Sequence, residues 1–85
     1  MKEYKFVIKD KMGIHARPAG LLVKEAGKFP CKVTIEKDGK EVDAKRIFGI
    51  MGLGAKCGQE IILRTDGEQE EEALETLSKF LEENM

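Results

Sequence analysis

The only histidine of the chain, His15, lies in the sequence GIHARPA at residues 13–19, close to Arg17 and Pro18. The residues that follow have helical apolar spacing, and Pro18 suits a first helical turn because its N–H is not needed there. The first N–H groups of a helix have no partner within the helix and carry partial positive charge, so they bind anions. A neutral imidazole is also a nucleophile near pH 7. This stretch therefore predicts a site that holds a phosphoryl group on His15, with the backbone N–H groups of Ala16 and Arg17 facing the phosphate oxygens.

The residues alone leave other interpretations open. A single histidine before a helix is more often a surface or capping residue, and Arg17 could be a solvated charge. An enzyme of its own, such as a small hydrolase, has no support, because the sequence contains no Ser/His/Asp set and no Walker-type glycine loop. We expect no metal and no cofactor, since one histidine and two scattered cysteines are a poor ligand set. Cys31 and Cys57 are expected to be free thiols of a cytoplasmic protein.

Hydrophobic periodicity predicts four strands and three helices in one α+β domain. The predicted strands are 4–9, 32–37, 40–44 and 61–65, and the predicted helices start at Ala16, lie within 46–54 and span 69–82. Asp38 and Gly39 predict a hairpin turn between the second and third strands. Because a hairpin lies in the middle and no βαβ alternation appears, we expect a four-stranded antiparallel sheet with helices on one face.

The length and the charge of the chain restrict the classes of partner that it is expected to bind. The 85 residues are expected to form one domain, 1–85, with a thin core. Acidic and basic residues number 16 and 15, a balance that argues against nucleic acid as a partner, and no apolar run is long enough for membrane insertion. Residues 66–85 hold eight acidic groups and one lysine, which suits a solvated acidic helix. Residues 1–65 hold 14 basic and eight acidic groups, which suits a positive face around His15 that meets an acidic partner.

Several motifs resemble those of the HPr family, the histidine phosphocarriers of the bacterial phosphoenolpyruvate-dependent sugar phosphotransferase system. They are GIHARPA at 13–19, LLVKEAGKF at 21–29, EKDGKEVDAK at 36–45 and IFGIMGLGAKCG at 47–58, followed by an acidic helix start after Gly67. The resemblance covers nearly the whole chain. It implies an open-faced β-sandwich and a carrier that is not itself an enzyme, and a monomer is the default expectation. His15 would accept a phosphoryl group, with Nδ1 as the expected acceptor atom, from phosphorylated enzyme I and pass it to IIA domains of sugar permeases. Arg17 would neutralise charge during the transfer.

A partner-binding surface beside His15 is also expected. The segment 46–54 is apolar nearly all round, so Ile47, Phe48 and Met51 are predicted to stay partly exposed, either as a docking surface or as a cap on the core. The resemblance favours docking. The expected partner-binding residues are Leu21, Lys24, Lys28, Lys45, Arg46, Ile47, Phe48 and Met51.

Arg46 departs from the family pattern. Many relatives have a serine in its place, which a regulatory kinase phosphorylates, so we expect that branch of regulation to be absent here. The alternative function is that of an HPr-like regulatory protein that binds partners without carrying sugar-uptake flux. The regulatory relative lacks the histidine and keeps the serine, whereas this chain has His15 and Arg46, which argues against that alternative.

Overall fold

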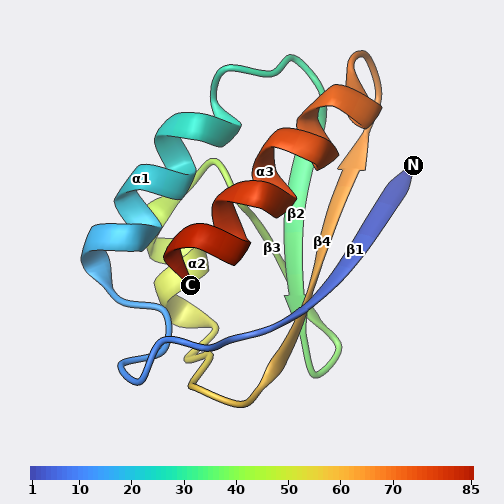
Figure 1. Cartoon of the computed structure of the whole chain (residues 1–85). Coiled ribbons are helices and arrows are strands. Elements are labelled where there is room, and N and C mark those ends of the chain that lie inside the picture. Colours follow the sequence, from blue (N-terminus) through green and yellow to red (C-terminus); the bar gives the residue numbers. More distant parts are fainter.

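A computed structural model describes all residues, 1–85, as four strands and three helices (Figure 1). The elements along the chain are β1 (Lys2–Val7), α1 (Ala16–Ala26), β2 (Lys32–Lys37), β3 (Lys40–Asp43), α2 (Ile47–Gly52), β4 (Glu60–Asp66) and α3 (Glu70–Asn84). The strands form one sheet in the order β1-β4-β2-β3, and every neighbouring pair is antiparallel. The three helices cover one face of this sheet and the other face is open (Figure 1). The predicted fold class, an open-faced β-sandwich, is confirmed.

Strand alternation explains which face is covered. In β4, Ile61, Leu63 and Thr65 are buried, whereas Ile62 and Arg64 between them are only half-buried. Successive strand residues point to opposite faces, so the buried set faces the helices. β4 lies inside the sheet, between β1 and β2, which suits its continuous apolar run at residues 61–63.

The first strand begins and ends earlier than its alternation predicts. Its ladder with β4 runs from Lys2 opposite Thr65 to Val7 opposite Glu60. Ile8 lies beyond the ladder, but it is buried, and its backbone bonds to Gln59 and Gly58 in the loop before β4. The burial of Phe6 and Ile8 therefore follows the alternation, although regular pairing stops at Val7.

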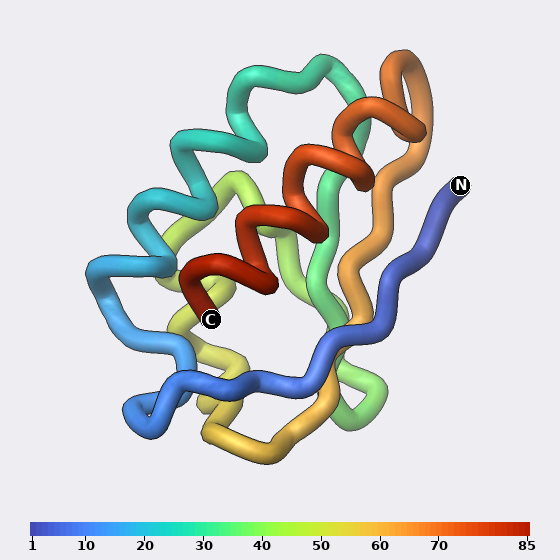
Figure 2. Tube along the Cα trace, viewed as in Figure 1, coloured from blue at the N-terminus to red at the C-terminus, as the bar shows by residue number.

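Helices α1 and α2 lie side by side and run in opposite directions. The backbone of Gly13, just before α1, lies against Ala55 beyond the end of α2, whereas Gly20 in α1 lies beside Ile47 at the start of α2. Figure 2 shows the chain leaving β1 through a loop that passes the C-terminal end of α3 before α1 begins. This loop and the first turn of α1 carry the residues of interest.

Candidate functional site

His15 is the residue immediately before α1. Its backbone is extended, with φ −125° and ψ 177°, and its carbonyl accepts the Ala19 N–H at 3.0 Å, the first bond of the helix. The side chain makes no capping bond to the backbone and is 31% exposed. Pro18 is buried in the first turn and anchors the start of the helix. The imidazole is therefore held at the helix start and remains accessible from outside.

The first turn of α1 offers two backbone donors beside the ring. Ala16 and Arg17 are its first two residues, so their N–H groups have no acceptor within the helix. Both residues are exposed, and Pro18 has no N–H to add. The turn contains no acidic residue, so the partial positive charge of the helix start is not offset there. An anion attached to the ring can be met by these two donors and by the Arg17 guanidinium.

The loop that precedes His15 is fixed against the loop between α2 and β4. Ile14 donates its N–H to the Ala55 carbonyl at 3.0 Å, and Gly13 donates to the Asp10 carbonyl at 2.9 Å. Gly13 has a φ of +69°, and a side chain there would bring its Cβ to 2.4 Å from the Ala55 oxygen. Only a glycine allows this approach. The GIHARPA motif thus needs its glycine to set the position of His15.

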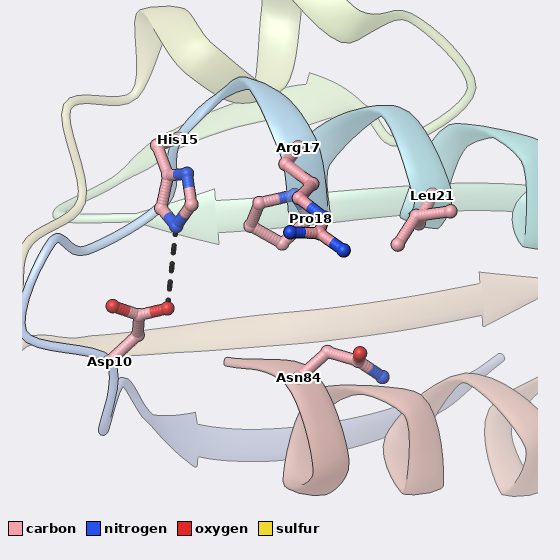
Figure 3. Close-up of a pocket in the computed structure, with 6 residues that line it drawn as sticks. All are labelled: Asp10, His15, Arg17, Pro18, Leu21 and Asn84. Carbon is pink, nitrogen blue, oxygen red and sulfur yellow. Dashed lines mark hydrogen bonds and ion pairs between the residues drawn. The ribbon is translucent and has the colours of Figure 1, made fainter.

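Asp10, in the loop between β1 and α1, is a neighbour of His15 that lies outside the GIHARPA motif. One of its carboxylate oxygens, Oδ2, lies 3.4 Å from Nε2 of His15 (Figure 3). Oδ1 accepts the Met12 N–H at 2.9 Å. The Met12 N–H lowers the pKa of the Asp10 carboxyl below its usual range, and the contact with His15 adds to this effect. The signal for this turn in the sequence is Asp10 followed three residues later by Gly13.

These residues line a shallow, open pocket between α1 and the end of α3. Its lining residues are Asp10, His15, Arg17, Pro18, Leu21 and Asn84 (Figure 3). Asn84, the last residue of α3, is a further member that the sequence did not indicate. The end of α3 is held to the loop because the Met85 backbone oxygen accepts the N–H groups of Lys9 and Asp10 at 2.7 and 2.8 Å.

The predicted apolar partner-binding residues lie on neighbouring helices. Leu21 on α1 is 45% exposed, and Phe48 and Met51 on α2 are 86% and 39% exposed. Ile47 is half-buried and packs beside Gly20 between the two helices. We call Leu21, Ile47, Phe48 and Met51 the apolar patch. The apolar patch lies on α1 and α2, and His15 is positioned where the start of α1 meets the end of α2.

The predicted basic residues are spread more widely. Lys24 is exposed on α1, but Lys28 follows the far end of α1, about 16 Å of helix away from His15, and pairs with Glu25 at 2.8 Å. Lys45 also lies at that end, where its Nζ donates to the Phe29 carbonyl at 2.7 Å. Arg46 is 82% exposed, with its Nε 3.7 Å from Asp43 Oδ2. Lys28 and Lys45 are therefore not brought near His15.

The structure shows few other groups that could bind a metal ion or react. No group of three or more His, Cys, Asp or Glu side chains is placed to bind a metal ion. Both cysteines are free, with Cys31 buried and Cys57 exposed. None of the helices has the length and apolar composition needed to cross a bilayer.

The fold and site define a class of protein: a small open-faced β-sandwich that presents one histidine at a helix start. A family model described as the PTS HPr component phosphorylation site matches residues 2–83. The chain is 45% identical to the HPr-like protein Crh of Bacillus subtilis over the full length of both, and 42% identical to the phosphocarrier protein HPr of Mycoplasma genitalium over 99% of this chain and 97% of that one.

Solved structures of HPr proteins have the same fold as this chain. HPr from Thermoanaerobacter tengcongensis superimposes with a TM-score of 0.91 at 48% identity, over 96% of this chain and 92% of that chain. A structure of an HPr dimer from the same organism gives a TM-score of 0.77 at 47% identity, over 98% and 95% of the two chains. The chain belongs to the HPr family of the phosphotransferase system, as its motifs predicted.

Proposed function

We propose that this protein carries phosphoryl groups, accepting one on Nδ1 of His15 from phosphorylated enzyme I and passing it to IIA components of sugar permeases. The observation that carries the proposal is the placement of the ring. Its Nε2 faces Asp10, whereas the other ring nitrogen lies on the side of the first turn of α1 (Figure 3). That turn supplies the unpaired N–H groups of Ala16 and Arg17. The nucleophilic atom and the donors for the phosphate oxygens thus lie together.

The transfer needs little from the protein besides position and charge. In accepting, the Nδ1 lone pair of the neutral ring attacks phosphorus, the N–P bond forms, and the bond to the donor breaks with its electron pair leaving on the donor atom. The two backbone donors and the Arg17 guanidinium stabilise the charge on the moving group. Because the His15 side chain is 31% exposed, the donor and the acceptor can both reach it.

Docking is proposed to use the apolar patch with Arg17, Lys24 and Arg46 around it. The large exposed fraction of Phe48 leaves it free to fill a pocket on a partner. The basic residues favour partners with acidic rims and speed encounter. Lys28 and Lys45 lie at the far end of α1, so they contribute to the field on this side of the molecule rather than to contacts at His15. We propose that the carrier works as a monomer in the cytoplasm and is not an enzyme.

A second candidate is a regulatory protein that binds partners without carrying flux. It is favoured by one observation, the 45% identity to the HPr-like protein Crh of Bacillus subtilis over both whole chains. The presence of His15 and the absence of a serine at position 46 favour the carrier. Position 46 has no hydroxyl to phosphorylate, and no serine or threonine occurs between Ala44 and Gly58.

Intact-mass measurement separates the two functions. The protein is incubated with phosphoenolpyruvate and enzyme I, and its mass is recorded before and after mild acid. A carrier gains one acid-labile phosphoryl group, and His15→Ala abolishes the gain. A protein that remains unmodified under conditions in which a control HPr is fully modified would refute the carrier function. Phosphoryl transfer from the modified protein to a IIA component then tests the second half of the relay.

The role of Arg46 is tested separately. We propose that its exposed guanidinium strengthens docking to an acidic partner at a small cost to α2, because a cation is slightly unfavourable at a helix start. The Arg46→Ser variant should transfer more slowly at low salt and lose much of the salt dependence of the wild type. An unchanged rate and an unchanged response to salt would remove this role.

A further inference from the structure

We propose that Asp10 is a positioning residue for His15, whose carboxylate accepts the Nε2–H of the ring and so presents Nδ1 to the phosphoryl donor. The inference rests on the proposed carrier function and adds to it a residue outside the GIHARPA motif. It follows from the 3.4 Å separation of Asp10 Oδ2 and His15 Nε2.

The carboxylate is held in place, which a solvated surface aspartate would not be. Its Oδ1 accepts the Met12 N–H at 2.9 Å, leaving Oδ2 to face the ring. Its backbone is fixed on both sides, since its N–H donates to the Met85 oxygen at 2.8 Å and its carbonyl accepts from Gly13 at 2.9 Å. The two facing side chains are 30% and 31% exposed. Catalytic hydrogen bonds are often long before substrate arrives, so 3.4 Å suits a bond that shortens when the ring becomes charged.

The attraction between the Asp10 carboxylate and the His15 ring becomes stronger during phosphoryl transfer. In the neutral ring, a proton on Nε2 leaves the lone pair on Nδ1. When Nδ1 attacks phosphorus, the proton stays on Nε2, and the ring becomes a cation opposite the Asp10 carboxylate. No proton has to be moved. The attraction therefore grows as the N–P bond forms, which is the kind of interaction that lowers a barrier rather than only tightening binding.

The same contact governs release. An imidazole leaves phosphorus readily only while Nε2 is protonated, because it then departs as a neutral ring. The Asp10 carboxylate that accepts this Nε2–H stabilises the protonated ring from which release occurs. Asp10 therefore extends the pH range in which the phosphorylated protein can donate its group.

Other charged groups surround this pair. Lys9 lies next to Asp10 in the chain but pairs with Glu82 at 2.8 Å, and Glu82 and Glu83 of α3 line the adjoining surface. Arg17 lies on the other side of the pocket. The carboxylate of Asp10 repels an incoming phosphoryl group, but it faces Nε2, away from Nδ1, and the Arg17 cation offsets part of the repulsion.

The test is the pH profile of phosphohistidine hydrolysis in wild type and Asp10→Asn, followed by ³¹P NMR. Phosphoramidate installs the phosphoryl group chemically, so the measurement needs no enzyme I. Asparagine keeps an oxygen that can accept the Met12 N–H and removes only the charge. The matched control is Asp43→Asn, because Asp43 Oδ1 accepts the Lys45 N–H at 2.8 Å in the same kind of turn but faces no histidine.

We expect Asp10→Asn to hydrolyse about threefold more slowly than wild type on the alkaline limb of the profile, where loss of the carboxylate charge matters most. Asp43→Asn should follow the wild type. Superimposable profiles for Asp10→Asn and wild type would overturn the role. Ring-¹⁵N NMR of the unmodified proteins gives a second readout, since the Nε2 resonance should differ between wild type and Asp10→Asn. A protein that enzyme I does not phosphorylate would refute the carrier function but leave this comparison intact.

Discussion

Gly13 is the residue through which the loop before His15 is joined to the rest of the molecule, and its replacement by alanine has a cost that can be worked out. At a φ of +69° an alanine costs about 1–2 kcal/mol. Its Cβ would lie 2.4 Å from the Ala55 oxygen and 2.9 Å from the Lys56 Cα, both backbone atoms, so the two loops must separate. Separation breaks the bond from Ile14 N–H to the Ala55 oxygen and leaves a buried polar group unpaired, which costs about 1–3 kcal/mol more. The expected loss of stability is therefore roughly 2–5 kcal/mol.

The matched control for this variant is Gly54→Ala. Gly54 has nearly the same φ, +63°, but no atom lies within 4 Å of a side chain placed there. Urea unfolding of both variants then separates the cost of the backbone conformation from the cost of the clash. Gly13→Ala should be the less stable of the two by about 1–3 kcal/mol, and it should accept phosphoryl groups more slowly because His15 moves with the loop. Equal loss of stability in the two variants would refute this account of the loop.

Three further predictions concern docking, acid stability and helix propensity. Phe48→Ala should leave stability within about 0.5 kcal/mol of wild type but weaken enzyme I binding, measured by calorimetry, about tenfold. Val7→Ala, on the open face of the sheet, should leave enzyme I binding unchanged. Equal binding by the two variants would count against the apolar patch. The Thr34 hydroxyl holds the pKa of Glu41 below its usual range, so Glu41 contributes stability above about pH 4.3 that is lost as the pH falls through its folded pKa. The stability difference between wild type and Glu41→Gln should therefore shrink below that pH, and a constant difference would contradict the assignment. Gly20→Ala should raise stability by about 0.5–1 kcal/mol, since the nearest atom to the new methyl group is at an ordinary 3.7 Å; a loss would show that the contact is tighter.

The fold could be read from the sequence because its signals are local and agree with one another. Alternation in the strands, the Asp38-Gly39 turn and the apolar stripe of α3 each specify one element, and the structure places all seven elements within a few residues of their predicted bounds. The predicted bounds differ from the observed ones at the ends of the strands and helices. Ile8 was assigned to β1 from its alternation, but its partners are loop residues 58 and 59, which the pattern of β1 cannot reveal.

Only the site residues that belong to a single motif could be predicted from the sequence. His15, Ala16 and Arg17 are adjacent in GIHARPA, so a helix start was enough to bring them together. Asp10 reaches the same pocket through a turn. Asn84 reaches it through the packing of α3, although it lies 69 residues after His15 in the chain. Charge counting likewise could not show that Lys45 turns its ammonium to the Phe29 carbonyl, because that bond depends on where α1 ends relative to α2.

The central claim is that the ring of His15 carries the phosphoryl group on the nitrogen that faces the start of α1. Because the chain has a single histidine, ring-¹⁵N labelling reports on that residue alone. After phosphorylation by enzyme I and phosphoenolpyruvate, ¹⁵N and ³¹P NMR should show the N–P bond at Nδ1 and a proton retained on Nε2. Phosphorus bonded to Nε2, or to any residue other than His15, would contradict the account.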